Sequence, residues 1–200
     1  MITHVMALPE GLRRFTLADL PRERWRNNMG WTRPVAAAGS AGTAAWRISL
    51  AEITQAAPFS RFEGMDRTAV LAHGGPLRLL GADQAWDLAH PGDIARFPGE
   101  LPLHNTTPDT PARIWNVMTR RGEAQADVTS CREGAVVLPA DIDTFAWVIS
   151  GRFVLSQADG LELCVLTQEE GLHRRPTQMP LALQLHAASP DAHLIVTHLA

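Results

Sequence analysis

The residues with the most evident chemistry lie in one short stretch, Arg24 to Pro34, which reads RWRNNMGWTRP. It contains three arginines, two asparagines, two tryptophans and one glycine. Guanidinium groups donate N–H bonds in pairs, amides both donate and accept, and indole rings stack on planar groups. A surface loop does not need two tryptophans, and a core strand does not favour two asparagines. The composition of this stretch therefore predicts a binding site.

Arg67 is the best candidate for an anchoring cation. It begins the segment RTAVLA after a Gly-Met-Asp turn, and on a strand Arg67, Ala69 and Leu71 share one face. An arginine on an inward face is costly to bury unless something pairs with it, which predicts a ligand or another acid as its partner. The alternative is simple exposure, or a structural salt bridge to one of three acids: Glu63, Asp66 or Glu100.

Asn116 is a second polar residue in an apolar setting, because it interrupts the segment ARIWNVMT. Asparagine is a poor strand former, and an interior amide needs hydrogen-bond partners. At the offset of an internal repeat, near eighty residues, its counterpart is Val196, and Arg67 corresponds to the neighbourhood of Phe145. One copy keeps polar groups and the other is apolar, which predicts a site in the first half only. A bulge, or a bond to neighbouring backbone, is the alternative for Asn116.

The elements that must position these residues are strands. Short apolar or alternating runs recur about every ten residues, separated by Gly, Pro, Asp and Asn, as in antiparallel sandwiches and barrels. AVLAHGGPLRLLGADQAWDL is echoed by AWVISGRFVLSQADGLELCV, and a repeat of this length indicates a duplicated domain. We expect an all-β bicupin with two jelly-roll barrels (double-stranded β-helices). Residues 1–125 form the barrel with the ligand pocket, and residues 126–200 form a smaller one.

The histidines do not have the spacing of a cupin metal centre. Such a centre takes His-x-His, a glutamate and a further histidine, since alternate residues face one side of a strand. The eight histidines here are scattered singly, so we expect no metal and no other cofactor. Convergence of His73 and His104 in space is left open. Glu100 would act as a base if it lay across the barrel from Arg67.

Composition excludes several classes of protein. The formal net charge is -3, lysine is absent, and no run of arginines is longer than a pair. We therefore expect no nucleic-acid partner. No window approaches the ~18 apolar residues of a membrane span, and the N-terminus does not resemble a signal peptide. We therefore expect a soluble cytoplasmic protein without a membrane partner. Cys131 and Cys164 are expected to be buried free thiols, with one disulfide between them as the alternative.

Five blocks in the first 120 residues resemble the HutD/Ves family. They read WRNNMGWTRP, WRISLAEI, PFSRFEGMDRTAVLAHGGPLRL, RFPGE and WNVMTRRG, in the order that the family shows. They combine Trp, Asn, Gly and Arg instead of generic apolar residues, whereas the last eighty residues match only in strand rhythm. The chain departs from the family at Pro34, where a glutamate is usual, and at Trp115, where a smaller aromatic residue or leucine is common.

The resemblance implies a bicupin fold without the usual metal cluster, and an association with histidine utilisation. Intermediates of histidine breakdown, such as urocanate and N-formylglutamate, are carboxylates, and a fixed guanidinium meets a carboxylate with two parallel N–H donors. We therefore expect a non-enzymatic protein that binds such an acid in the N-terminal barrel and modulates histidine utilisation. The residues expected to bind it are Arg67, Asn28, Asn116, Trp25, Arg33 and Glu100.

No catalytic residue is assigned, since no nucleophile, activated base or metal set is evident. The alternative function is a metal-independent cupin enzyme, an isomerase or hydrolase, that acts on such a carboxylate with Glu100 or a histidine as base. A structural partner of a pathway protein is a third interpretation. The second barrel completes the fold or forms an oligomer contact, which is compatible with a homodimer. Trp46, Phe59 and Phe62 are expected in the core.

Overall fold

The computed structural model describes residues 8–39, 42–178 and 181–200, and there it contains strands, one short 3₁₀ turn and no α-helix. The prediction of an all-β protein is therefore confirmed. Contacts divide the chain into two compact units. The central unit is Leu20–Ala126, and the terminal unit joins Met1–Asp19 to Asp127–Ala200.

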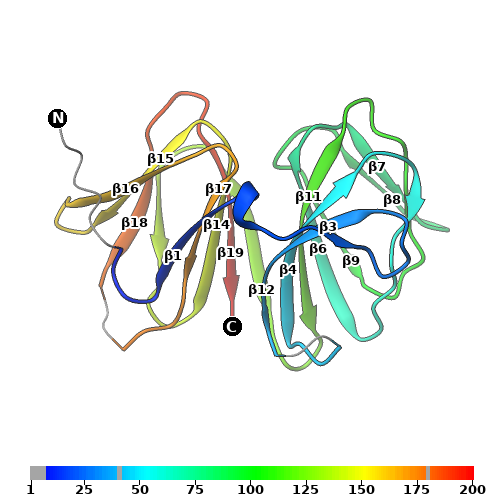
Figure 1. Cartoon of the computed structure of the whole chain (residues 1–200), viewed down its shortest axis with the longest axis horizontal. Helices are drawn as coiled ribbons and strands as arrows, with labels where there is room; N and C mark the ends of the chain where they lie inside the picture. The colour runs from blue at the N-terminus through cyan, green and yellow to red at the C-terminus, as the bar shows by residue number, and fades with distance from the viewer. Residues whose placement is uncertain (1–7, 40–41, 179–180) are drawn as a thin grey trace. The chain divides into compact units, whose positions relative to one another are not determined.

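The central unit consists of two antiparallel sheets (Figure 1). Within the described residues, its larger sheet has the spatial order β2 (Glu23–Arg24), β3 (Trp31–Ala38), β4 (Trp46–Ile53), β11 (Ala112–Arg120), β6 (Met65–His73) and β9 (Ile94–Pro98). The order in its smaller sheet is β5 (Ala57–Pro58), β10 (His104–Asn105), β7 (Leu77–Leu80) and β8 (Ala85–Leu88). The apolar and β-branched content of these segments suits strands with one face on a core.

The terminal unit also consists of two antiparallel sheets. The order in the larger one is β1 (Leu12–Thr16), β17 (Glu170–Arg174), β14 (Asp143–Ser150), β19 (His193–Leu199) and β12 (Ala126–Cys131). The order in the smaller one is β13 (Ala135–Leu138), β18 (Leu183–Ala187), β15 (Arg152–Gln157) and β16 (Glu162–Thr167). The 3₁₀ turn, η1 (Leu17–Asp19), follows β1.

The first strand belongs with the end of the chain and not with the residues that follow it. β1 pairs with β17, with Leu12 opposite Arg174 and Thr16 opposite Glu170, and Figure 1 draws it among the strands of the terminal unit. Phe15 explains this placement, because its ring is 2% exposed and stacks on Trp147 at 5.9 Å between centroids. A division at residue 125 assigns this strand to the N-terminal domain, whereas the structure groups it with the terminal unit.

Four strands of the larger sheet and all four strands of the smaller sheet have the same order in the two units. The larger sheets correspond strand by strand: the order β4-β11-β6-β9 in the central unit matches the order β12-β19-β14-β17 in the terminal unit. The smaller sheets correspond in the same way, as β5-β10-β7-β8 and β13-β18-β15-β16. A matching irregularity fixes the alignment: the β11–β6 register shifts between Arg113 and Ile114, and the β14–β19 register shifts between Val148 and Ser150. By this register Asn116 corresponds to Val196 and Arg67 to Thr144.

Each unit has its own apolar core from inward-facing residues of both sheets. In the central unit the core includes Ala69, Leu71 and Ile114, and in the terminal unit it includes Ala146, Val148 and Leu194. Cys131 and Cys164 are free thiols that are partly buried, and burial raises the pKa of both. Nowhere in the described residues does a helix have the length and apolarity that a membrane span requires.

Candidate functional site

Neighbouring strands β6 and β11 place Arg67 and Asn116 together inside the central unit. Arg67 lies opposite Met118, and Asn116 lies opposite Ala69. Because side chains alternate along a strand, Arg67 shares the inner face of β6 with Ala69 and Leu71, which belong to the core. Arg67 is 8% exposed and Asn116 is 4% exposed. The period-two expectation for Arg67 therefore agrees with its position in the fold.

The guanidinium of Arg67 is held by neutral acceptors. Its Nε and Nη2 donate to Oδ1 of Asn116 at 3.3 Å and 3.0 Å, and its Nη1 donates to the carbonyl oxygen of Ser60 at 3.1 Å. Since arginine only donates, the amide oxygen of Asn116 must face it and the amide nitrogen must face away. That nitrogen lies 3.5 Å from the hydroxyl of Ser49 on β4. Asn116 thus fixes the orientation of Arg67.

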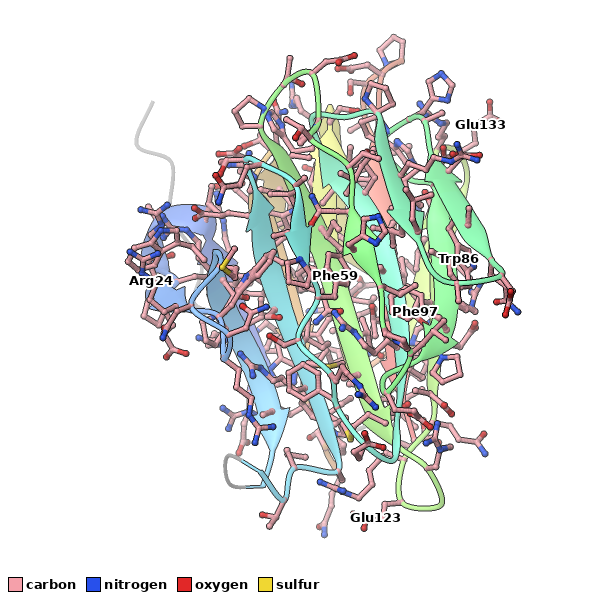
Figure 2. The ribbon with its side chains drawn as sticks, turned by 90° about the vertical axis from the view of Figure 1, so that its right-hand side faces the viewer. Arg24, Phe59, Trp86, Phe97, Glu123 and Glu133 are labelled. Atoms are coloured by element: carbon pink, nitrogen blue, oxygen red, sulfur yellow. The ribbon has the colours of Figure 1, made fainter. Side chains whose placement is uncertain are left out.

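Three phenylalanine rings surround the same guanidinium. Its central carbon lies 5.1 Å from the ring centroid of Phe59, 5.7 Å from that of Phe62 and 5.3 Å from that of Phe97. Figure 2 labels Phe59 near the middle of the view and Phe97 farther from Arg24; Phe97 belongs to the edge strand β9, and Arg24 lies at the opposite, β2–β3 edge of the sheet. Aromatic rings stabilise a cation without neutralising it. The rings hold the charge in place and leave it available to an anion.

The positive charge of Arg67 has no carboxylate partner among the described residues. Burial is the main cause that lowers the pKa of Arg67 to about 10, and the like charge of Arg47 lowers it further. The group is still cationic at neutral pH. An isolated buried charge is strongly unfavourable unless it is paired, so this position favours the arrival of an anion.

A cavity of about 900 Å³ opens beside Arg67 and Asn116. Its volume falls within the usual range for small-molecule sites. The cations on its wall outnumber the acids, which are Glu23 and Glu63. The lining arginines are Arg24, Arg26, Arg47, Arg61, Arg67 and Arg120. Such an excess raises the local concentration of anions and orients them as they enter.

Trp25, which the sequence assigned to the site, also lines this cavity. Its indole nitrogen donates to the carbonyl oxygen of Trp31 at 2.6 Å, and its ring meets Phe59 edge-on at 6.1 Å. Gly30 permits this packing, because a Cβ there would lie 2.7 Å from atoms of the Trp25 ring. The loop therefore contributes one aromatic wall, whose position is fixed by the backbone of Gly30 and Trp31.

Asn28 does not reach the cavity, contrary to the sequence prediction. It is exposed and occupies the left-handed backbone region at φ 60, where its N–H donates to the carbonyl oxygen of Trp25 at 2.9 Å. Asparagine tolerates this conformation better than most residues, which explains its presence in the turn. Its neighbour Asn27 donates from its side chain to the carbonyl oxygen of Pro58 at 2.8 Å. Both amides shape the loop.

Arg33 lies outside the group of residues that line the cavity and pairs elsewhere. Its Nε lies 3.0 Å from a carboxylate oxygen of Glu52, and its Nη1 donates to the carbonyl oxygen of Leu20 at 2.8 Å. On β3 its neighbours Thr32 and Pro34 line the cavity, so alternation directs Arg33 to the opposite face. This is the physical reason that its expected ligand role does not fit the structure.

Glu100 is likewise not among the cavity-lining residues. One of its carboxylate oxygens lies 2.5 Å from the guanidinium of Arg121, which also pairs with Asp66 at 2.9 Å. The hydrogen bond from Arg121 is the main cause that lowers the pKa of Glu100. A carboxylate stabilised as an anion is a weak proton acceptor, so the geometry does not support Glu100 as a ligand or a general base.

Arg47 is the functional candidate that the sequence prediction missed. It lines the cavity from β4, and with Ser49 it occupies the inner face of that strand. In the sheet Met118 lies opposite both Arg47 and Arg67, which puts the two arginines on one row, two strands apart. Neighbouring strands lie about 4.8 Å apart, so the backbones at these residues are about 10 Å apart. The sequence signal for this role was the spacing of two between Arg47 and Ser49 in the segment WRISLAEI.

Phe59 and Phe62 were expected only as core residues, yet both line the cavity beside Arg67. Phe59 belongs to the apolar core as well. Among the described residues, no group of three or more His, Cys, Asp or Glu side chains could hold a metal ion. What the residues on this wall can do is bind and orient an anionic molecule.

The terminal unit also holds a buried cation, contrary to the prediction of an apolar second copy. Arg174 on β17 is 2% exposed and lies opposite Thr144, the counterpart of Arg67. Val196, in contrast, is an apolar core residue, as its alignment with Asn116 requires. Both units therefore contain buried polar groups, but at different positions of the corresponding sheets.

Solved structures share this fold over almost the whole chain. The conserved protein of unknown function PA5104 from Pseudomonas aeruginosa PAO1 superposes with a TM-score of 0.80 at 24% identity, over 94% of this chain and 98% of that one. HutD from Pseudomonas fluorescens SBW25 gives 0.78 at 16% identity over the same shares. YlbA from E. coli and oxalate decarboxylase from Bacillus subtilis give 0.72 and 0.57, both at 10% identity, and support a cupin-like fold.

Sequence relatives point to the same family. Protein Ves from Cronobacter sakazakii is 29% identical over 57% of this chain and 64% of its own length. Protein Ves from Escherichia fergusonii is 28% identical over 78% and 80%. An uncharacterised 21.2 kDa protein in the hutC 3′ region of Pseudomonas putida is 33% identical over 41% and 44%. The HutD family model matches residues 17–192. The chain therefore belongs to the HutD family, which includes the Ves proteins.

Proposed function

We propose that this protein binds a small carboxylate in the central unit, at Arg67, and does not transform it. One observation supports this most directly. A guanidinium that is buried and cationic at neutral pH faces a cavity with only neutral acceptors around it. A carboxylate supplies the missing charge and accepts N–H bonds with better geometry than an inorganic monoanion.

The fold that we propose is a bicupin, with one jelly-roll barrel in each unit. Support comes from the matched strand order of the two units and from the irregularity at the same point in both. The proposed barrels correspond to Leu20–Ala126 and to the terminal unit, so the domain boundaries follow contacts instead of chain order. In this arrangement the inner faces of β4, β6 and β11 form the wall of the binding cavity.

For the ligand we propose an acid intermediate of histidine degradation, of the urocanate or N-formylglutamate type. The family and the location of the Pseudomonas putida relative beside hutC support the pathway. The pair of arginines on one row favours N-formylglutamate, because it carries two carboxylates and urocanate carries one. Arg67 would take one carboxylate and Arg47 the other, with the ring of Trp25 against the carbon chain. Binding would let the protein report on, or buffer, the pathway.

Isothermal titration calorimetry with N-formylglutamate and with urocanate tests the proposal. We expect saturable binding of at least one of them, tighter for N-formylglutamate, and loss of binding in Arg67→Met. Arg33→Met is the matched control, since Arg33 lies on β3 of the same sheet but does not line the cavity. Absence of heat from both acids at millimolar concentration, or equal affinity in Arg67→Met, would refute the proposal.

A further inference from the structure

Arg174 is a second buried arginine, and nothing in the proposed function uses it. It ends β17 on the inner face of the terminal unit, next along that face to Leu172, which belongs to the apolar core. The residue is 2% exposed. Ordinary surface arginines keep their charge in water, so a guanidinium at this depth needs a specific reason.

The partners of this guanidinium are backbone carbonyls. Its Nη1 donates to the carbonyl oxygen of Leu138, and its Nη2 donates to that of Leu181 at 2.6 Å. Among the described residues, neither Glu10 nor another carboxylate forms a salt bridge with it. Burial is the main cause that lowers the pKa of Arg174, and Asp141 partly opposes it. Arginine has five N–H donors, so two carbonyls leave donors unused and no carboxylate in direct contact with the charge.

A cavity of about 360 Å³ lies against this arginine. Thr177 and Gln178 add a hydroxyl and an amide to its wall, and Leu181 and Leu183 add apolar surface. The volume is near the lower end of the range for small-molecule pockets. A molecule that fits has one anionic end for Arg174 and a short apolar body for the leucines. An inorganic anion would leave that apolar surface unused.

We infer that the terminal unit has its own binding site for a small organic monocarboxylate, with Arg174 as the anchor and Thr177 and Gln178 as polar neighbours. This site is independent of the cavity at Arg67 and does not rest on the function proposed for it. Glu10 lies at the same cavity and is exposed. Its negative charge opposes an incoming carboxylate, so it limits the affinity of the site.

The test uses the full chain with Arg67→Met, which removes the proposed anchor of the central cavity, and it reads signals that belong to the terminal site alone. Sodium acetate and sodium butyrate are titrated in turn, and ¹H–¹⁵N spectra follow the Nε–H signal of Arg174 and the amide signals of Thr177 and Gln178. We expect saturable shifts of these signals, with butyrate binding tighter by about threefold for each added methylene. Sodium chloride at matched ionic strength is the control for a bare anion.

Two further variants separate binding from folding. Adding Arg174→Met abolishes the shifts, with circular dichroism to confirm the β-sheet content. Adding Glu10→Gln leaves the arginine in place and tightens butyrate binding by about threefold at low salt, because a nearby like charge is removed. The inference is overturned if butyrate causes no saturable shift, if chloride shifts the signals equally, or if Arg174→Met binds butyrate unchanged.

Discussion

In the central unit the buried guanidinium comes from β6, whereas in the terminal unit it comes from β17, the neighbour of the strand that corresponds to β6. Arg67 lies opposite Phe97, and Arg174 lies opposite Thr144. Arg174 therefore takes the place of Phe97, and Thr144 takes the place of Arg67. Each arginine lies on the corresponding row of the larger sheet of its own unit. The fold determines the row that accepts a cation, and the sequence of each copy determines which strand supplies it.

The reason for a common row is the division of each interior into two parts. On β6 and β11, Leu71 and Ile114 pack in the core, and Arg67 and Asn116 follow further along the same inner faces. The terminal unit repeats the pattern, with Val148 in the core and Thr144 further along. Apolar residues fill one part of each interior, and charged or polar residues lie where the packing ends beside a cavity.

The largest effect on stability and ligand binding is expected when a residue of the central unit is replaced by its counterpart from the terminal unit. Asn116→Val introduces the residue found at the counterpart Val196 and removes two hydrogen bonds from a buried guanidinium. We expect a loss of about 3 kcal/mol in the free energy of unfolding of this unit and loss of ligand binding. Urea unfolding followed by tryptophan fluorescence measures it, since five of the six tryptophans lie in this unit.

The double variant Arg67→Thr/Asn116→Val completes that exchange. With the unmatched cation gone, it should be more stable than Asn116→Val alone, although it does not bind the acid. A double variant that is as unstable as the single one would mean that Asn116 acts through packing and not through Arg67.

The second prediction compares two glycines that lie under aromatic rings, one in each unit. A Cβ on Gly171 would collide with the ring of Phe15, which is 2% exposed and cannot shift, whereas Trp25 above Gly30 is only partly buried. We expect Gly171→Ala to cost about 2 kcal/mol in stability and Gly30→Ala to cost about 1 kcal/mol. Gly30→Ala should also weaken ligand binding, because Trp25 lines the cavity. Thermal unfolding measures the stability cost of both variants, and calorimetry measures their ligand binding. A larger stability cost for Gly30→Ala than for Gly171→Ala would contradict the comparison.

The third prediction concerns pH, because the terminal unit holds buried histidines and His73, His90 and His104 of the central unit are exposed. Burial lowers the pKa of His173, against the opposing effect of its bond to Asp143, and burial lowers the pKa of His198.

Below the ordinary histidine pKa of about 6.5, the unfolded chain therefore binds protons that the folded chain does not. Stability of the terminal unit should fall as pH decreases from 6.5 towards the folded pKa values. Urea unfolding at several pH values, read by fluorescence of Trp147 in a variant without the other tryptophans, measures the slope. His198→Gln should make the stability of the terminal unit depend less steeply on pH. An unchanged slope of stability against pH would assign the dependence to other groups.

The smallest effect is expected at Arg33, which tests the limit of the site. Its salt bridge to Glu52 is partly exposed, so Arg33→Met should cost at most about 1 kcal/mol. Affinity for the acid should stay within about twofold of the parent value, since a charge that is partly exposed and already paired adds little to the field in the cavity. Calorimetry of this variant alone is sufficient, and a tenfold loss of affinity would return Arg33 to the binding site.

Sequence patterns predicted the strand-rich fold, the repeat and the inward position of Arg67 because each depends on a period of two or on a fixed offset. They did not separate the roles of residues within the loop at Trp25. Asn28 was assigned to the ligand because its side chain can bond to one, but the turn requires a residue that tolerates positive φ. Local composition does not show which of these two needs applies.

The sequence also does not show which face of a strand a side chain occupies or which strands pair with each other. Arg33 and Arg47 are both arginines on strands, and only the register of β3, β4 and β11 shows that Arg47 faces the cavity. Arg174 was not among the predicted site residues, because the sequence does not show that its strand pairs beside Thr144 with its side chain directed inward. The offset between the two units is 77 residues from Arg67 to Thr144 and 80 residues from Asn116 to Val196, so a single sequence offset does not locate every counterpart.

The pairing of β1 with β17 has a consequence for synthesis on the ribosome. β1 emerges first, yet Thr16 waits for Glu170, and the whole central unit is translated between them. The nascent chain therefore carries an unpaired edge with Phe15 uncovered while the intervening unit is free to complete itself. Pairing of β1 with β17 therefore follows synthesis of the whole central unit, and until then Phe15 lacks the ring of Trp147 on which it stacks in the folded chain.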